Sequence, residues 1–430
     1  MLRKIKLSFF LIVILAASTF AQQAESFTVN GLKVILKQNT SNDIVAVSLV
    51  FKGGTTILEP NQAGIEALTL NVALKASENY PKDKLNAELE SMATQLGASS
   101  SLDYSSINMQ CVKQNFENSW NILSDVVPNP SFTQEDFKLE REQFISGAKQ
   151  AEDNADSYLQ KIFRNGFYGD HPYSIEVNGT ENTLNSFTVE QLKDFFSERK
   201  TTSQMLLVVV GNTSRSELEP MVADAFGSLP VGEFKMQIPP STSFSEPSIK
   251  IVHRELPTNY IQSSYSAPVR TTDEGYTMNI TSSILRDRVW EEVRTKRSLS
   301  YAITSRYGNA LSNYAAIYVT AVDADSTVKV MINELQKLMD ELISARELEN
   351  KKRQFITFYY LGNETNQSQA GVLTRFELSG AGFEEADKFI DKLMKVTPED
   401  IQSVANKYMN NLQFVLIGDP ESLEVKNFMY

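Results

Sequence analysis

The same sequence pattern occurs twice, in SFTVEQLKDFFSERKTTSQMLLVVVGN (186–212) and in KVTPEDIQSVANKYMNNLQFVLIGD (395–419). Each has a Thr cap with Glu two residues later, an amphipathic helix, a short polar link and an apolar strand that ends in Gly. DYSSINMQC (103–111) likewise echoes NYAAIYVTA (313–321), and QFI at 143–145 returns at 354–356. All three offsets lie between 207 and 211 residues and the pairs keep their order. The chain is therefore a tandem duplication of a unit of about 200 residues.

Within the first unit, alternating β-branched strands come first and long helices follow. FTVNGLKVILKQ carries an NG turn signal, IVAVSLVFKGG reads as a strand, and SLDYSSINMQCV reads as another. KDKLNAELESMATQL reads as a helix, and longer helices are expected near 115–126, 133–150 and 155–166. Runs of strands and helices without steady βαβ alternation predict an α+β unit, a mostly antiparallel sheet with helices on one face. The Pro- and Ser-rich segment 232–248 is the expected linker between domains at 22–231 and 249–430.

The stretch NQAGIEALTLNVALKAS (61–77) has the pattern of a helix. Ile65, Leu68 and Val72 recur at steps of three and four, and other apolar residues fill much of the opposite side. Asn61 offers a possible cap. A helix that is apolar nearly all round is predicted to be buried in the core.

The N-terminus has the pattern of a secretory signal. MLRKIKLSFFLIVILAASTFAQQ combines a basic start, a short apolar run and small residues before Gln22, which predicts a signal peptide at 1–21 with cleavage after Ala21. An uncleaved anchor helix is the alternative, although the apolar run is short for a membrane span. We expect an exported protein, periplasmic or secreted, with no stable membrane span after cleavage.

Charge and cysteine content exclude other classes of protein. Removing the three basic residues of the signal from 41 Lys and Arg leaves 38 against 53 Asp and Glu, a net charge near −15. Such a surface repels nucleic acid and favours neutral or basic ligands. The single Cys111 cannot form an internal disulfide and is expected to be a small buried hydrophobe.

Nearly the whole mature chain resembles the M16 family, the pitrilysin-like (inverzincin) metallopeptidases and their relatives the mitochondrial processing peptidases. The resemblance implies the M16/LuxS-like metallohydrolase-type fold. It rests on these pieces and their spacings: NGLKVILKQN, FKGGTTILEPNQAGIEAL, FTQEDFKLEREQF, FYGDHPYSIEVNGTENTLNSFTVEQLKDFF, MLLVVVGN and FGSLP.

The family's zinc site is an H-x-x-E-H run on a helix after FKGG, with a further Glu ligand about 75 residues later. Aligned on AGIEAL, the two His positions are Ala67 and Asn71 and the Glu position is Leu70, while the later ligand falls at Gly147. None of these residues serves well, so the resemblance implies a degenerate zinc site with no metal in this chain. Glu140, another helix acid of the family, remains and is expected to be solvated or hydrogen-bonded.

The chain's two His residues do not offer a substitute site. His171 lies in the loop motif GDHPY, which this family carries outside its metal site, and His253 lies in the expected strand IKIVHREL. They belong to different units, and neither has a second His or a Cys at ligand spacing. Both are expected to be structural or exposed.

In the second unit, EEVRTKR reads as a helix end and LSYAITSRYG as a strand. By spacing alone, Arg294 is a cation near a helix end and Tyr301 a core residue on a strand. The resemblance implies more, because pitrilysin-like enzymes complete their site with an R-x₆-Y pair, which Arg294 and Tyr301 match here. A guanidinium and a phenol can donate to the oxyanion of a tetrahedral intermediate or hold the substrate backbone. Arg297 is the alternative if the register slips.

Some bacterial relatives are heterodimers in which one chain carries zinc and the other carries the Arg/Tyr pair. The resemblance implies that this chain is the second kind, inactive alone, with a homologous H-x-x-E-H partner that holds zinc and with unfolded peptides as substrates. A catalytically inert peptide-binding or scaffold protein with the same fold is the alternative. An autonomous hydrolase of another chemistry is weakest, since no nucleophile–base pair is visible.

Overall fold

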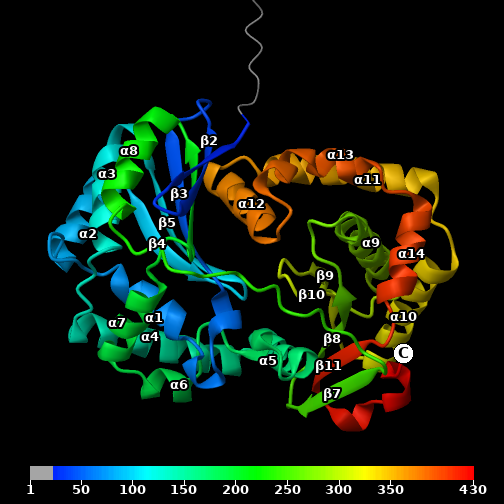
Figure 1. The fold of residues 1–430 in the computed structure, drawn as a ribbon. Coiled ribbons are helices and arrows are strands. Elements are labelled where there is room, and N and C mark those ends of the chain that lie inside the picture. The colour runs from blue at the N-terminus through cyan, green and yellow to red at the C-terminus, as the bar shows by residue number, and fades with distance from the viewer. Residues whose placement is uncertain (1–22) are drawn as a thin grey trace, which may run out of the picture.

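Residues 23–430 fold around two β-sheets in the computed structural model of the chain (Figure 1). The predicted signal segment at 1–21 lies outside the described residues. The first sheet has the order β1-β2-β6-β3-β5-β4, and the second has the order β7-β11-β8-β10-β9. The strands are β1 (Glu25–Val29), β2 (Leu32–Gln38), β3 (Ile44–Lys52), β4 (Gln95–Ser100), β5 (Tyr104–Val112), β6 (Met205–Gly211), β7 (Ser248–His253), β8 (Asn259–Ala267), β9 (Ile303–Tyr307), β10 (Asn313–Ala321) and β11 (Gln413–Gly418).

The two sheets have the same connectivity. β2 pairs in parallel with β6, as β7 does with β11, and the remaining neighbours in both sheets are antiparallel. The five strands of the second sheet correspond in order to β2, β6, β3, β5 and β4, and β1 is the extra strand of the first sheet. This confirms the predicted pair of repeated α+β units.

Each unit places its own helices mainly on one face of its sheet. In the first sheet, Val47, Leu49, Leu207 and Val209 lie on this face and pack with the surrounding helices in one large core. The helices are α1 (Ile65–Ala73), α2 (Lys82–Ser91), α3 (Phe116–Val126), α4 (Gln134–Asp153), α5 (Ala155–Tyr168), α6 (Glu181–Ser186), α7 (Val189–Arg199), α8 (Arg215–Phe226), α9 (Asp273–Val289), α10 (Ala324–Asp340), α11 (Ala345–Gly362), α12 (Asn366–Leu378), α13 (Phe389–Met394) and α14 (Pro398–Tyr408). No helix within residues 23–430 is long and apolar enough to cross a membrane.

The opposite face of each sheet receives a helix from the other unit. α12 of the second unit packs on β3 and β6, where Leu373 and Phe376 join Ile35, Val50 and Val208 in a separate apolar cluster. Figure 1 shows this helix in orange beside the first sheet. The sheet residues of this cluster alternate with those of the main core, so β6 is buried on both faces. Its continuous apolar run, MLLVVVG, reflects that two-sided burial.

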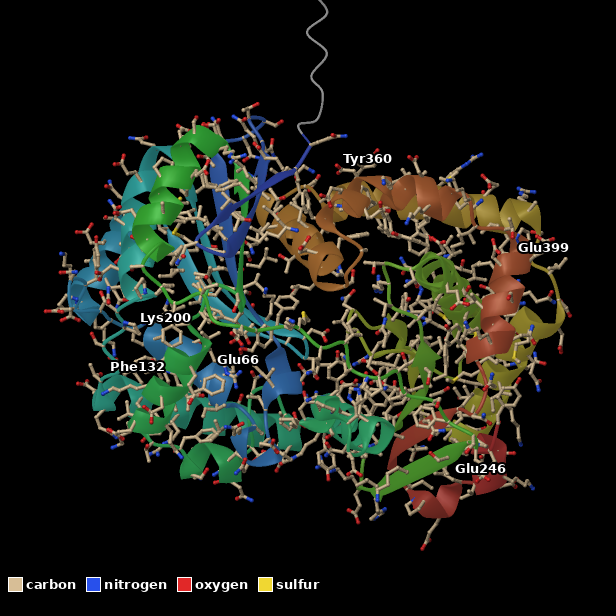
Figure 2. The ribbon with its side chains drawn as sticks, viewed as in Figure 1. Glu66, Phe132, Lys200, Glu246, Tyr360 and Glu399 are labelled. Carbon is tan, nitrogen blue, oxygen red and sulfur yellow. The ribbon has the colours of Figure 1, made fainter. Side chains whose placement is uncertain are left out.

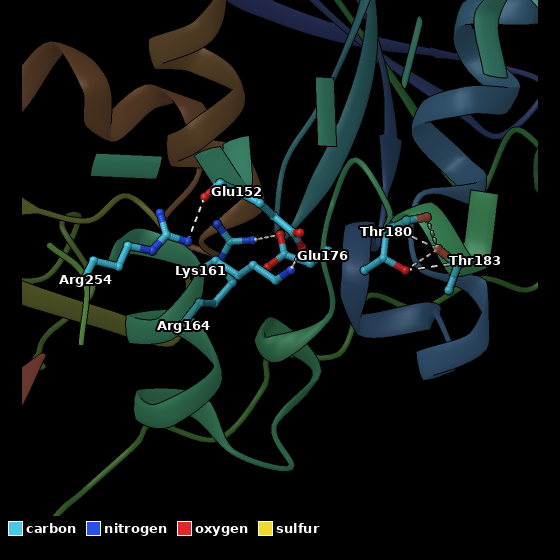
Figure 3. A network of polar contacts seen from close by, with 7 residues as sticks. All are labelled: Glu152, Lys161, Arg164, Glu176, Thr180, Thr183 and Arg254. Atoms are coloured by element: carbon cyan, nitrogen blue, oxygen red, sulfur yellow. Dashed lines mark hydrogen bonds and ion pairs between the residues drawn. The ribbon is translucent and has the colours of Figure 1, made fainter. Parts of the chain in front are cut away.

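α5 of the first unit occupies the equivalent place on the second sheet, against β8 and β11. Phe163 packs on Tyr314 with ring centroids 4.6 Å apart, and Gln160 donates to Gln262 at 2.8 Å. The end of α4 is tied across as well, because Arg254 donates to the Glu152 carbonyl at 2.9 Å (Figure 3). The two units therefore exchange helices.

Three local predictions differ from the structure. The opening helix begins at Ile65 and is capped by Gly64, while Asn61 lies in a preceding short turn. The second helix ends at Ser91, because Ala93 takes a positive φ of 49° and β4 then pairs with β5. In the second unit, β9 starts only at Ile303, which leaves Tyr301 on the preceding loop.

Candidate functional site

The positions that the sequence comparison with the family assigns to a degenerate zinc site lie on two helices in contact, α1 and α4. Ala67 and Leu70 are buried on α1, and Leu70 belongs to the main core of the first unit. The Asn71 amide donates to the Ala67 carbonyl one turn back, at 2.8 Å. Gly147 is exposed on α4, with open space where a side chain would project.

These residues do not fit zinc. Ala67 and Leu70 have no donor atom, Gly147 has no side chain, and the amide of Asn71 is engaged by its own helix. Structural and catalytic zinc sites need three or four Cys, His or carboxylate ligands. Within residues 23–430, no group of three or more His, Cys, Asp or Glu side chains is placed to hold a metal ion.

An ion pair lies beside the degenerate positions. Glu140 is buried, and its carboxylate lies 2.8 Å from the ammonium of Lys75, which stands one helical turn beyond Asn71. Lys82 pairs similarly with Asp136 at 2.6 Å. Although burial acts to raise it, hydrogen bonds from Lys82 and Thr133 hold the pKa of Asp136 below its usual range. Of the two expectations for Glu140, solvated or hydrogen-bonded, the structure therefore favours the second, because the side chain is buried and paired with Lys75.

A second acid, Glu66, is buried on α1 directly before Ala67 (Figure 2). Burial raises the pKa of Glu66 to about 7, an effect that the neighbouring Ser105 hydroxyl and the Arg199 charge only partly offset. The carboxyl therefore titrates near neutral pH. A perturbed acid in this region is a signature of catalytic sites as well as of buried polar networks. Here no metal ligand accompanies it.

The start of α1 is fixed by a close approach of backbone. Gly64 has a φ of 87°, and a Cβ at this position would lie 2.5 Å from the Cα of Gly179. Thr180 and Thr183 cap the start of α6 (Figure 3), and the Thr183 hydroxyl donates to the Ala63 carbonyl at 2.8 Å. The sequence pieces NQAGIEAL and VNGTENT thus meet in space and set the direction of α1.

Arg294 and Tyr301 lie side by side in the second unit. Arg294 stands on a π-helical turn, η5 (Trp290–Thr295), that directly continues α9. Its guanidinium stacks 4.3 Å above the Trp290 ring and 5.6 Å from the Tyr301 ring, and it donates to the Tyr301 carbonyl at 3.1 Å. Tyr301 is 79 % exposed. The phenol is therefore presented to solvent rather than packed in a core.

Arg297, the alternative partner, is bound elsewhere. It and Lys296 both pair with Glu292, Lys296 at 2.6 Å. Hydrogen bonds from Lys296 and Arg297 lower the pKa of Glu292 to about 2. Arg294, by contrast, has no carboxylate within 4 Å in the described part of the chain. The geometry favours Arg294 over Arg297 as the partner of Tyr301.

The two His residues lie apart from these positions. His171 is structural, since its Nδ1 accepts from the Tyr173 amide and its Nε2 lies 3.1 Å from the Pro240 carbonyl. Burial lowers the pKa of His171. His253 is exposed at the end of β7. Cys111 is buried in β5, as expected.

Two family models match the chain. The one described as Insulinase (Peptidase family M16) matches residues 33–181, and the one described as Peptidase M16 inactive domain matches residues 186–355. The chain belongs to the M16 peptidase family. This confirms the resemblance read from the sequence.

Individual M16 relatives are similar along their whole length. An uncharacterized zinc protease of Rickettsia felis is 22 % identical over 92 % of this chain and 97 % of its own. A non-peptidase homolog, YmxG of Helicobacter pylori, is 20 % identical over 95 % and 98 %. The crystal structure of a peptidase M16 inactive domain from Pseudomonas fluorescens has a TM-score of 0.84 at 19 % identity and covers 92 % of this chain and 97 % of its own.

Sequence reasoning missed two features of this M16 chain. Glu66 carried a signal, an acid inside a helix that is otherwise apolar nearly all round. The ion pair of Glu140 with Lys75 had only a weak signal, because Lys75 lies in the turn after α1 and Glu140 lies on α4, far along the sequence.

Proposed function

We propose that this M16 chain is the non-catalytic subunit of a heterodimeric exported zinc metallopeptidase. A homologous partner with an intact H-x-x-E-H motif supplies zinc and the general base, and this chain supplies Arg294 and Tyr301 for substrate binding and oxyanion stabilisation. One observation carries the proposal. The Arg/Tyr pair is together and accessible, with a guanidinium free of carboxylates, whereas the zinc positions of the same chain hold no suitable donors.

The pair is suited to this role by its geometry. Trp290 supports the guanidinium from one side, and the bond to the Tyr301 carbonyl ties the loop to the π-helical turn. The remaining N–H groups and the phenol can then meet developing negative charge with little reorganisation. π-Helical turns inside helices occur frequently at functional sites.

Peptide substrates fit the sheet edges. β4 and β9 are edge strands, so within the described residues each lacks a strand neighbour on one side. An extended peptide can pair with such an edge through its main chain. The negative net charge favours neutral or basic peptides.

The direct test is reconstitution. The chain is purified alone and with an H-x-x-E-H partner encoded nearby, and cleavage of a quenched fluorescent peptide is measured. Only the pair should cleave, and Arg294→Ala or Tyr301→Phe should lower kcat/KM of the complex by about 100-fold. Arg297→Ala is the matched control and should have little effect. Zinc-dependent cleavage by this chain alone would refute the proposal.

The alternative, an inert peptide-binding or scaffold protein, agrees with the name of the Helicobacter pylori relative. It requires that both variants leave the activity of any complex unchanged. Export rests on the N-terminal pattern. It is tested by cell fractionation and N-terminal sequencing, which should find the mature chain starting at Gln22.

A further inference from the structure

A pocket of about 330 Å³ opens in the second unit between α9, α11, α12 and α13. Its volume is within the range of small-molecule sites. Five of the twelve lining residues are aromatic, and two arginines, Arg270 and Arg375, join them. No Asp, Glu, Lys or His is among the lining residues. The aromatic residues are Phe355, Phe358, Tyr359, Phe376 and Phe389.

The pocket is the second unit's counterpart of the degenerate zinc site. Asn279 is the seventh residue of α9, as Asn71 is the seventh residue of α1. Phe358 is the fourteenth residue of α11, as Gly147 is the fourteenth residue of α4. Asn279 and Phe358 both line the pocket. The duplication has therefore produced, between equivalent helices, a cavity with a different chemistry.

Both guanidiniums are held by neutral acceptors. Arg270 donates to the carbonyls of Tyr307 at 2.7 Å and Gly308 at 2.8 Å, and Arg375 donates to the Asn309 side chain at 3.2 Å. Within residues 23–430, neither has a carboxylate within 4 Å. Burial lowers the pKa of Arg270 to about 10, and the nearby charge of Arg375 adds to the effect. At neutral pH the pocket thus holds two positive charges, and in the described part of the chain neither has a carboxylate within ion-pair distance.

We propose that this pocket binds an organic carboxylate, with the carboxyl group at the two guanidiniums and an aromatic or branched apolar body against the rings. Arginine forks match the geometry of a carboxylate, and a buried charge is costly without an anionic partner. The aromatic walls favour a ligand with one charge and a large apolar part. Such a group occurs at the C-terminus of a peptide ending in Phe or Leu, and in free arylalkyl acids. The site needs no zinc-bearing partner, so it is independent of the proposed peptidase function.

Calorimetric titration of the mature chain tests the proposal with three probes. These are N-acetyl-Ala-Ala-Phe as the free acid, the same peptide as its C-terminal amide, and 3-phenylpropanoate. The free acid should bind saturably with one site, and the amide should bind at least about tenfold more weakly. Tighter binding of the peptide acid identifies peptide ends as the ligand, and equal or tighter binding of 3-phenylpropanoate identifies free acids.

Variants then locate the site. Arg375→Gln and Phe358→Ala should each weaken binding of the free acid, Arg375→Gln by about tenfold. The controls Arg353→Gln and Leu361→Ala lie on α11 outside the lining, are exposed, and should bind as the wild type does. Phe358 is 56 % exposed, so Phe358→Ala should fold normally. If Arg375→Gln fails to fold, Phe358→Ala decides the test. Equal binding of acid and amide, no saturable binding of the acid, or wild-type affinity in Phe358→Ala would overturn the proposal.

Discussion

At the residue scale, the described part of the first unit holds no set of metal ligands, yet it keeps buried charges. Glu140 pairs with Lys75, whereas at Glu66 burial outweighs the effects of Ser105 and Arg199 and raises the pKa to about 7. An unpaired buried carboxylate lowers stability when it ionises. Glu66 should therefore couple the stability of the chain to pH in the neutral range.

Replacing Glu66 with Gln tests this coupling. The unfolded carboxyl loses its proton near its usual pKa of 4.5 and the folded one near 7, so the penalty grows across that window and is complete above it. Glu66→Gln should leave the free energy of unfolding nearly unchanged at pH 4.5 and raise it by roughly 3 kcal/mol at pH 8.

Urea unfolding at both pH values measures the difference. Glu90→Gln, an exposed change on α2, is the control and should show no such pH dependence. An equal effect of Glu66→Gln at both pH values would contradict the assignment.

At the element scale, α12 is the clearest case of a helix whose partner is not its own sheet. Besides its apolar cluster, Asn366 donates to the Ile44 carbonyl at 2.6 Å, and Glu377 pairs with Lys33 at 2.6 Å. Contacts along the whole helix thus fix its position on β3 and β6.

Leu373→Ala should remove a buried side chain from this contact and lower the free energy of unfolding by about 2–4 kcal/mol. Differential scanning calorimetry should show one transition shifted down as a whole, since both sheets depend on the exchange. Leu361→Ala, 55 % exposed on α11, should have little effect. A transition that splits in two would show that the units unfold independently.

Local pattern predicted most of the elements but not their partners. The helices expected near 133–150 and 155–166 are α4 (Gln134–Asp153) and α5 (Ala155–Tyr168). Amphipathic spacing shows that α5 has an apolar face, but it does not show which sheet that face covers. The local pattern also predicts a strand that includes Tyr301, because it does not show where pairing with a neighbouring strand begins. Its position is set by the Arg294 bond and the long-range pairing of β9 with β10.

At the scale of the whole molecule, the two repeated units follow one another in the chain, but each packs one helix onto the sheet of the other. Each sheet is completed by a helix of the other unit, and Asp103 of the first unit accepts a hydrogen bond from the Leu311 amide at 3.1 Å. A half alone would leave one apolar face of its sheet uncovered.

Expressed separately, residues 22–231 and 249–430 should each be aggregation-prone, because an exposed apolar sheet face favours association. Expressed together, they should assemble into a soluble complex that copurifies through a tag on one half. Size-exclusion chromatography measures both outcomes. Two halves that are each soluble and monomeric would contradict the structural role of the exchange.

The exchange of α5 and α12 also determines at what point of synthesis the packing of the two sheets can be completed. Strand β6 is complete once residue 211 has been made, yet the helix that covers its second face ends only at residue 378. More than a third of the chain is therefore synthesised after β6 is complete and before α12 can cover the second face of the first sheet. We expect stalled chains ending before α12 to be cut readily by protease, and chains extending well past it to resist. A delay of this kind suits the export proposed above, because translocation requires an unfolded chain.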